Sequence, residues 1–378
     1  MNEFDFDSIR PFNDDEIAPA IKKVVSNPKF DAVLDFLFPG EQEKYRSYYA
    51  NSKSVKEIQT KFMYAAMETI AQRTSKGITH SGFEKYPDTG HIIISNHRDI
   101  LLDPGFLCYI LMKEGFQTVS ITFGNNLILS PFFENIAKLN KMITVIRDGS
   151  PRELLFNSIR LSKYISQEVI EKRNSIWVAQ RPGRTKNGDD KTEISILKML
   201  SYYEKHNYYK ALKQLDIYPM AITYEWEPCD IMKVREVYLS RKSTYIKGKT
   251  EDLQSTIGGI INPKGRIHYA LCNPLNDFIE TIDAKKQNND YLAAIARQID
   301  TQIYRNYKLW PTNYLAYDML EGSSKYAGVY DNELKEKFEA RFARIKEVLP
   351  DGDMDELKDL FLKIYANPVY NQLSVIRK

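Results

Sequence analysis

The chain has 378 residues, of which 43% are hydrophobic and 27% charged, enough for the core of one large domain or of two to three smaller ones. Its 53 basic and 50 acidic side chains give a formal charge of only +3, which argues against nucleic acid as a partner. The three cysteines, Cys108, Cys229 and Cys272, lie far apart without metal-ligand spacing, so we expect no metal site and a reducing, cytoplasmic location.

Two further absences in the sequence concern membranes. No run of about 18 apolar residues occurs, so no segment is expected to span a bilayer. The acidic, polar N-terminus MNEFDFDSIRPFNDDE is unlike a signal peptide. We therefore expect a soluble protein that is at most peripheral on the inner face of the cell membrane.

The first part of the chain has helical periodicity. Residues 13–27, NDDEIAPAIKKVVSN, begin with capping-type residues and then space apolar residues by three and four. Residues 54–73 repeat that spacing over a longer run. The pattern predicts an N-terminal helical region over residues 1–78.

From Gly82 onward, short β-branched runs alternate with amphipathic stretches. The expected strands are HIIIS at 91–95, TVSITF at 118–123, ITVI at 143–146, SIWVAQ at 175–180, YPMAITY at 218–224 and RIHYAL at 266–271. The clearest helices between them cover 151–172 and 193–215. This alternation predicts an α/β unit over 79–285, with a mixed, mostly parallel sheet flanked by helices.

The last part of the chain is helical again. Amphipathic spacing runs through YLAAIARQIDTQIYRNY at 291–307 and NELKEKFEARFARIKEVL at 332–349. We therefore expect a C-terminal helical region over 286–378.

The stretch SNHRDILLDP at 95–104 follows the first strand of the α/β unit. Because ligands of α/β sheets bind beyond the carboxyl ends of strands, His97 lies where a functional histidine would be useful. Asp103 and Pro104 suit the cap and first position of the next helix. The alternative interpretation is that Asp103 only caps this helix and that His97 is a solvated loop residue.

His-Arg-Asp followed by apolar residues is also typical of a protein-kinase catalytic loop. That loop needs an Asn five residues after the Asp, where this chain has Pro104, which cannot hold a metal ion. The Asp of the downstream Asp-Phe-Gly triplet is missing too, since the chain reads Thr122-Phe123-Gly124. With both metal ligands absent, the sequence excludes a kinase.

Four blocks of the sequence occur in a fixed order, each with an expected strand. They are Asn96-His97 with Asp103, FGNNLILSPFFENIAKLNKMITVIR ending at Arg147, IWVAQRPGRTKNG, and IYPMAITYE around Pro219. Over roughly residues 82–275 this arrangement resembles the glycerol-3-phosphate and 1-acylglycerol-3-phosphate (lysophosphatidate) acyltransferase superfamily. Two later stretches, PKGRIHYALCNPL and LWPTNYLAYDML, are similar to a bacterial subgroup of it. The resemblance implies an acyltransferase-like α/β fold.

The chain departs from the family pattern at two places. The family usually has four residues between His and Asp, which would put the acid at Leu102. This chain has five, so we favour Asp103 and keep Asp99 as the rival partner of the histidine. In the third block Pro182 precedes Gly183 where the family has Glu. The contribution of that Glu must be absent or supplied by another residue.

Acyl transfer to an alcohol needs a base, a donor for the oxyanion and a grip on the acceptor. A neutral histidine is the natural base near neutral pH, and a carboxylate on its other ring nitrogen fixes the tautomer. We expect His97 to be the base with Asp103, or Asp99, as that carboxylate. Asn96 and the loop amides around Gly183 are the candidate oxyanion donors. The acceptor hydroxyl can attack directly, so no nucleophilic Ser or Cys is required.

An acceptor phosphate calls for arginine, which binds it in bidentate fashion. The block resemblance favours Arg147 and Arg184 for this role, with Arg181 and Lys186 as further basic residues of the third-block loop. The apolar segment at 125–136 is expected to be a buried helix or, alternatively, an apolar lid that touches lipid.

The resemblance therefore implies an enzyme of phospholipid synthesis. It would move a fatty acyl group from an acyl thioester, on coenzyme A or acyl carrier protein, to the hydroxyl of glycerol 3-phosphate or 1-acylglycerol 3-phosphate. No cofactor is expected beyond this donor substrate. The alternatives are transfer to another lipid-like alcohol, or an inactive lipid-binding or scaffold relative, for which Pro182 is the motive.

Overall fold

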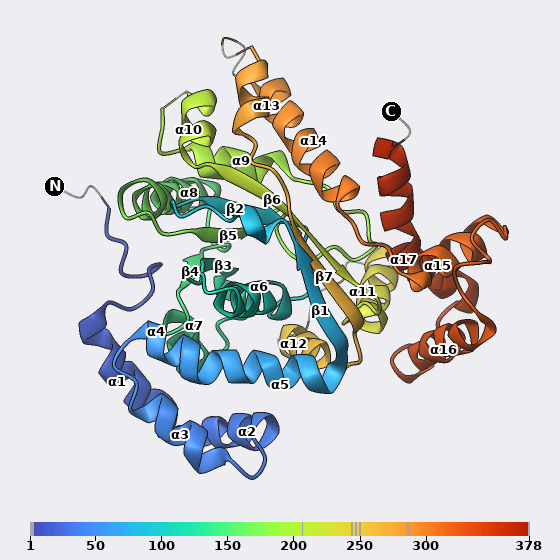
Figure 1. Cartoon of the computed structure of the whole chain (residues 1–378), viewed down its shortest axis with the longest axis horizontal. Coiled ribbons are helices and arrows are strands. Elements are labelled where there is room, and N and C mark those ends of the chain that lie inside the picture. The colour runs from blue at the N-terminus through green and yellow to red at the C-terminus, as the bar shows by residue number, and fades with distance from the viewer. Residues whose placement is uncertain are drawn as a thin grey trace.

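A seven-stranded sheet lies at the centre of the chain, in a computed structural model that describes residues 4–376 except 206, 243–244, 246–247, 249–250, 284 and 286–287 (Figure 1). The strands are β1 Ser75–Ser81, β2 Ile92–Ser95, β3 Ser120–Gly124, β4 Met142–Val145, β5 Ile176–Ala179, β6 Ile217–Tyr224 and β7 Gly265–Leu271. Their order across the sheet is β1-β7-β6-β2-β5-β3-β4. Only the β6–β7 pair is antiparallel among the described strands, so the expected mixed, mostly parallel sheet is confirmed.

All six expected strands are present, but β1 was not expected from the sequence. Its seven residues expose Lys76, Gly77, Thr79 and Ser81, and Ile78 is its one aliphatic side chain. An edge strand that pairs on one side only needs no continuous apolar run, and β1 is held by its parallel pairing with β7. The domain boundary expected at residue 78 falls inside this strand, and the three-part division stays a prediction.

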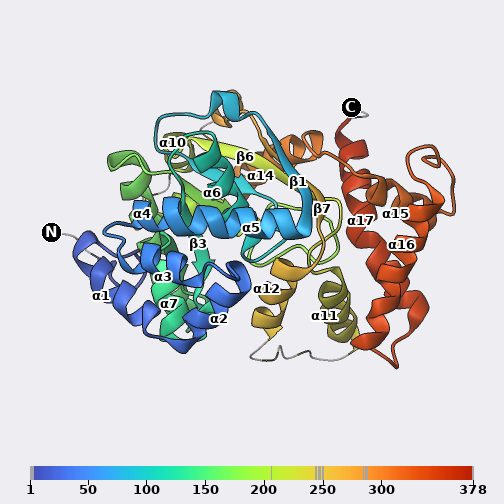
Figure 2. The ribbon, with the colours of Figure 1, turned by 60° about the horizontal axis from the view of Figure 1, so that its bottom comes forward.

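Helices cover both faces of the sheet (Figures 1 and 2). They are α1 Asp14–Val25, α2 Pro28–Leu37, α3 Gln42–Ala50, α4 Val55–Ile58, α5 Tyr64–Thr74, α6 Leu102–Lys113, α7 Pro131–Lys138, α8 Pro151–Ser166, α9 Ile194–Ser201, α10 Tyr208–Gln214, α11 Asp230–Lys242, α12 Glu251–Ile261, α13 Asn276–Thr281, α14 Asn289–Arg305, α15 Pro311–Glu321, α16 Asn332–Ala343 and α17 Met354–Ile376. A π-helical turn, Gln59–Met63, joins α4 to α5. No helix in the described ranges is long and apolar enough to cross a membrane.

The alternation of strand residues divides the interior between the two faces. In β2, Ile93 points into a core shared with α5, α6 and the N-terminal helices, whereas Ile92 and Ile94 point into a second core with α8, α9 and α14. A third cluster joins α11 to α15, α16 and α17. The strand β2 is therefore buried on both faces and between two neighbours, which fixes where its C-terminal end emerges.

The apolar segment 125–136 contacts the first core through its second half. Phe132 is buried, Phe133 packs against the same cluster, and Leu129 is 41% exposed. The segment forms a 3-10 turn, Asn125–Leu127, followed by α7. The interpretation as a buried helix therefore holds in part, for the start of α7 around Phe132, and not for the half-buried and exposed residues before it.

Candidate active site

The loop that leaves β2 turns at Asp99, whose side chain binds the backbone just before and at the start of helix α6. Asp99 Oδ1 accepts hydrogen bonds from the backbone N–H groups of Leu101, at 2.9 Å, and Leu102, at 2.8 Å. Helix α6 begins at Leu102, so the expected cap at Asp103 and first position at Pro104 are wrong. Because Asp99 satisfies these backbone donors, the Asp103 side chain in the first turn is free to face back toward the loop.

Asp103 is the hydrogen-bond partner of His97. The His97 Nδ1 lies 2.9 Å from Asp103 Oδ2, and the backbone N–H groups of Arg98 and Asp99 donate to the same oxygen at 2.6 and 2.9 Å. The other oxygen, Oδ1, accepts the Tyr224 hydroxyl at 2.9 Å. This fully buried carboxylate places the proton of a neutral His97 on Nδ1 and leaves the lone pair of Nε2 free.

The His97 ring is held in place but keeps one edge open. Its edge contacts the ring of Trp177, with centroids 5.5 Å apart, and its side chain is 12% exposed. Among the residues that the structure describes, no group hydrogen-bonds to Nε2. The His97 carbonyl accepts the Thr185 N–H at 2.9 Å, which ties the third-block loop to the histidine. A proton of a bound hydroxyl can therefore be taken only at Nε2.

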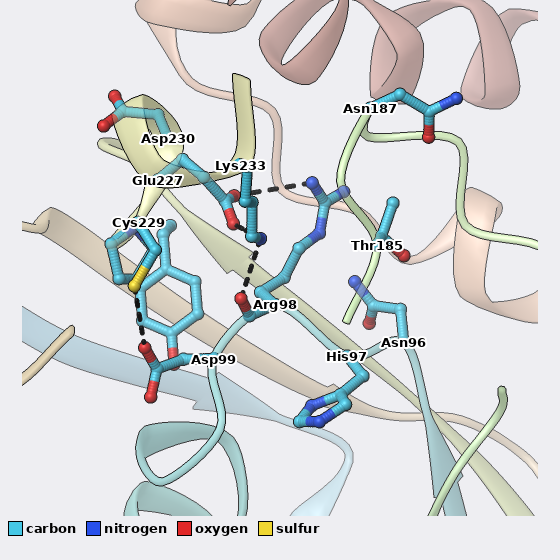
Figure 3. Close-up of polar contacts among 12 residues, drawn as sticks. Asn96, His97, Arg98, Asp99, Thr185, Asn187, Glu227, Cys229, Asp230 and Lys233 are labelled. Carbon is cyan, nitrogen blue, oxygen red and sulfur yellow. Dashed lines mark hydrogen bonds and ion pairs between the residues drawn. The ribbon is translucent and has the colours of Figure 1, made fainter. Parts of the chain in front are cut away.

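Asp99 points away from His97, and its environment disfavours its charge. Its Oδ2 lies 3.6 Å from the Cys229 sulfur and so close to Gly259 that a Cβ there would come within 2.1 Å (Figure 3). Burial, and then the charge of Asp103, raise the pKa of Asp99, against its backbone hydrogen bonds and Arg184. Of the two rival carboxylates, only Asp103 contacts the histidine in the described structure.

Arg98 anchors the loop from the side opposite the His97 ring (Figure 3). Its guanidinium donates to Asp190 at 2.5 Å and to Glu227 at 3.5 Å, while Lys233 donates to the Arg98 carbonyl at 2.8 Å and also pairs with Glu227. Burial opposes the charge of Arg98, but Asp190 and Glu227 raise its pKa above the ordinary value. We missed this network in the sequence, where its partners lie 92 or more residues from Arg98.

Asn96, a candidate oxyanion donor, is committed to the fold. Its amide nitrogen donates to Asp190 Oδ2 at 3.1 Å and to the Ile222 carbonyl at 2.9 Å, and its oxygen accepts the Ile222 N–H at 2.8 Å. Both N–H groups of the amide are used, so Asn96 pins β2 to β6. Asn96 therefore has no N–H group to spare for an oxyanion, and the amides around Gly183 remain the expected donors.

Arg184 is a buried cation that pairs with no carboxylate among the described residues. It is 6% exposed, and its Nη1 has no hydrogen-bond partner in the described part of the chain. Its charge acts on Asp99 and Cys229, which places it beside the His97 loop. Gly183, just before Arg184, has a φ of +75°, a left-handed conformation that glycine adopts without strain. A buried guanidinium of this kind is suited to an anion that enters from outside.

Arg147 lies at the same edge of the sheet but farther along it. It follows β4, three strands from β2, so the two strand ends are about 14 Å apart at the usual spacing of about 4.8 Å. Its side chain lies over Gly124 at the end of β3, where a Cβ would be 2.8 Å from its Nε. The residue is exposed, yet burial of the guanidinium lowers the pKa of Arg147, against the charge of Asp252.

The other two basic residues of the third-block loop are engaged in ion pairs. Lys186 pairs with Glu236 of α11, and Arg181 lies 3.8 Å from Glu193. Pro182, at the position of the family Glu, is exposed. The buried acid of this loop is Asp190, which holds Asn96 and Arg98 as described and also accepts the Thr185 and Tyr307 hydroxyls.

Two cavities lie away from His97. One of about 480 Å³ borders the start of α8, lined by residues from Asp148 to Asn157, and one of about 380 Å³ lies beside α11 and α12. No group of three or more His, Cys, Asp or Glu residues in the described ranges could hold a metal ion.

Comparisons with known proteins found one remote likeness to report. No family model matches the chain. No curated protein matches it either. Among solved structures it is similar to the 1-acyl-sn-glycerophosphate (LPA) acyltransferase PlsC from Thermotoga maritima, at 14% identity over 76% of this chain and 95% of that chain, with a TM-score of 0.36. A likeness this distant does not assign an activity.

Proposed function

We propose that the chain is an acyltransferase that moves a fatty acyl group from an acyl thioester to the hydroxyl of glycerol 3-phosphate or 1-acylglycerol 3-phosphate. The observation that carries the proposal is the His97–Asp103 pair, 2.9 Å between Nδ1 and Oδ2, at the carboxyl end of the central strand. A solvated loop histidine would not need a fully buried carboxylate on its Nδ1. The resemblance of the four sequence blocks indicates that the reaction which this pair would serve is acyl transfer.

In the proposed reaction His97 acts as a general base and then as a general acid. Nε2 takes the proton of the acceptor hydroxyl as its oxygen attacks the thioester carbonyl carbon, and a tetrahedral oxyanion forms. Asp103 stabilises the resulting imidazolium through Nδ1–H. When the carbon–sulfur bond breaks, Nε2–H returns the proton to the leaving thiolate. The products are an ester and a free thiol.

Direct attack by the hydroxyl fits the state of the cysteines. All three are buried. Burial raises the pKa of Cys108 to about 11 and that of Cys229 and Cys272 to about 12. Thiols with such values do not form the thiolate that nucleophilic catalysis needs near neutral pH. A covalent acyl-cysteine route is therefore disfavoured.

The phosphate of the acceptor would bind to Arg184 and Arg147. Arg184 is buried, has no carboxylate partner within the part of the chain that the structure describes, and is joined to the His97 loop through its neighbour Thr185. Arg147 reaches back over the end of β3 toward the same edge. Arg181 and Lys186 already pair with acidic residues, so they are secondary candidates.

One observation favours a second function, an inactive lipid-binding relative. Pro182 is exposed and carries no acidic group where the family has Glu. Against this alternative stands Asp103, since a binding protein gains nothing from a buried carboxylate aligned on a histidine. Transfer to another lipid-like alcohol keeps the same His97 chemistry and differs only in the acceptor.

The test is release of free thiol and formation of ester by the purified chain. Acyl-CoA and acyl-carrier donors are each supplied with and without glycerol 3-phosphate or 1-acylglycerol 3-phosphate. We expect acceptor-dependent thiol release that is lost in His97→Ala and kept in His80→Ala, which removes a histidine paired with Glu114. Turnover with neither donor class would favour the inactive relative, and turnover only with another alcohol would correct the acceptor.

A further inference from the structure

The two oxygens of the Asp103 carboxylate accept different numbers of hydrogen bonds. Three donors, His97 Nδ1 and the backbone N–H groups of Arg98 and Asp99, converge on Oδ2. For Oδ1, the Tyr224 hydroxyl at 2.9 Å is the only donor in the described part of the chain. A buried carboxylate oxygen without a donor is costly, so this one hydrogen bond satisfies Oδ1 and sets how the charge is shared between the two oxygens.

Tyr224 reaches Asp103 from a strand far away in the sequence. It is the last residue of β6, and its side chain lies in the first core with Met220 and Ile222, under α6. Its hydroxyl is buried and has one other neighbour among the described residues, the Tyr269 hydroxyl at 3.4 Å. A tyrosine that only filled the core would not need to aim its hydroxyl at the carboxylate that holds His97.

Tyr269 of β7 also reaches the first turn of α6, but its hydroxyl bonds to different atoms. Its hydroxyl donates to the backbone carbonyls of Leu102, at 3.2 Å, and Asp103, at 3.0 Å, and makes no hydrogen bond to the Asp103 carboxylate in the described structure. Burial raises the pKa of both tyrosines well above the ordinary value, so both remain neutral donors near neutral pH. Tyr269 therefore supports the backbone of the same helical turn, and Tyr224 supports its carboxylate.

We propose that Tyr224 is a positioning residue, whose hydroxyl holds Asp103 Oδ1 and shares the charge of the carboxylate, while the Arg98 and Asp99 N–H groups keep Oδ2 beside His97. The inference about catalysis rests on the proposed function, but the coupling between Tyr224 and His97 does not. Without the hydroxyl, more of the carboxylate charge falls on the bond to His97 Nδ1–H, which favours the imidazolium. Removing the hydroxyl should therefore make His97 easier to protonate.

Tyr224→Phe leaves the identity of the other ionisable groups around the pair unchanged. They are Asp99 on the same loop, Cys108 on α6, Arg184 on the third-block loop, Cys229 before α11 and Tyr269 on β7. The Arg98 side chain points away toward Asp190 and Glu227. A change in the His97 titration in Tyr224→Phe thus reports on the bond to Asp103.

The experiment is an NMR titration of the His97 ring in the full chain, for the wild type, Tyr224→Phe and Tyr269→Phe, with His97→Gln to assign the signal. We expect the midpoint to move to higher pH by about half a unit in Tyr224→Phe, as for one hydrogen bond shared with a carboxylate. It should stay unchanged in Tyr269→Phe. An unmoved midpoint in Tyr224→Phe, or equal movement in both variants, would overturn the proposal.

Activity provides the second readout and keeps the two proposals apart. In an active wild type, Tyr224→Phe should lower kcat about tenfold with KM nearly unchanged, since one hydrogen bond to a charged group is lost. An inactive wild type would remove the proposed function while leaving the titration result standing. If Tyr224→Phe does not fold, a fluorinated tyrosine at position 224 keeps the ring and donates more strongly. It should move the midpoint to lower pH, and no movement would refute the role.

Discussion

Replacing Arg184 with methionine should stabilise the folded chain while it weakens the use of a phosphate acceptor. The guanidinium is 6% exposed, and Nη1 is enclosed without a partner in the described structure. An unsatisfied buried donor costs about 1–3 kcal/mol, and methionine fills a similar length without a polar group. We therefore expect the free energy of unfolding to rise by about 1–3 kcal/mol. The replacement also removes the attraction between Arg184 and the Asp99 carboxylate. This loss of stability is small, because burial already disfavours the charged form of Asp99.

The same replacement should damage acceptor binding. A guanidinium that holds a phosphate contributes about 1.5–3 kcal/mol, so KM for glycerol 3-phosphate should rise ten- to a hundredfold. KM for the acyl donor should stay nearly constant. Arg184→Lys should restore acceptor use only in part, since a point charge lacks the planar fork. Arg160→Met is the matched control, because Arg160 on α8 also has a buried Nε without a hydrogen-bond partner among the described residues.

Urea unfolding with and without glycerol 3-phosphate measures both effects in one assay. At a hundredfold excess over Kd, the ligand should raise the free energy of unfolding of the wild type by about 2.7 kcal/mol. It should raise that of Arg184→Met far less, and that of Arg160→Met as in the wild type. An Arg184→Met variant that is less stable than the wild type and equally stabilised by the ligand would refute the phosphate site.

Three further outcomes are expected. His97→Ala should fold and lose on the order of 10²–10⁴ in kcat, measured by thiol release, because the side chain contributes little to the core. Asp103→Asn should lower kcat more than Asp99→Asn, since only Asp103 contacts His97; the reverse order in steady-state kinetics would contradict the assignment. Burial raises the pKa of Asp300 to about 6, against its Thr192 hydrogen bonds. As the pH rises, Asp300 therefore loses its proton in the unfolded chain before it does so in the folded chain. The free energy of unfolding should for this reason fall by about 2–3 kcal/mol from pH 4 to 6. Asp300→Asn should remove this fall in urea titrations at each pH, and an unchanged fall would assign it to other groups.

The sheet could be predicted where burial dictates the sequence. β2 shows Ile92, Ile93 and Ile94 in succession because both faces and both edges of the strand are covered. β1 could not be predicted, since its exposed positions carry polar residues and its register is set by the backbone of β7, nearly 190 residues later. The expected helix boundary at Asp103 was wrong for a local reason, because the Asp99 side chain accepts the backbone N–H groups of Leu101 and Leu102, where α6 begins.

The candidate site could be predicted as far as its position. His97 follows a strand with a strong pattern, so its place at the edge of the sheet could be inferred. The choice between Asp99 and Asp103 depends on the path of a short loop, which spacing does not determine. Tyr224 and Tyr269 lie 121 and 166 residues from Asp103, so nothing local in the sequence indicates that they meet it.

The structure of the third-block loop bears on whether Pro182, in place of the family Glu, indicates an inactive protein. This loop does carry a buried carboxylate near the histidine, but it comes from Asp190, which binds Arg98 and Asn96 on either side of His97. Arg98 is tied onward through Glu227 and Lys233, and the neighbouring Asp230 pairs with Arg341 of α16. The backbone that carries His97 is therefore fixed by charges from three distant segments. An exposed proline in the turn at 182 leaves these bonds intact, so its presence argues less strongly for an inactive relative than the sequence alone indicates.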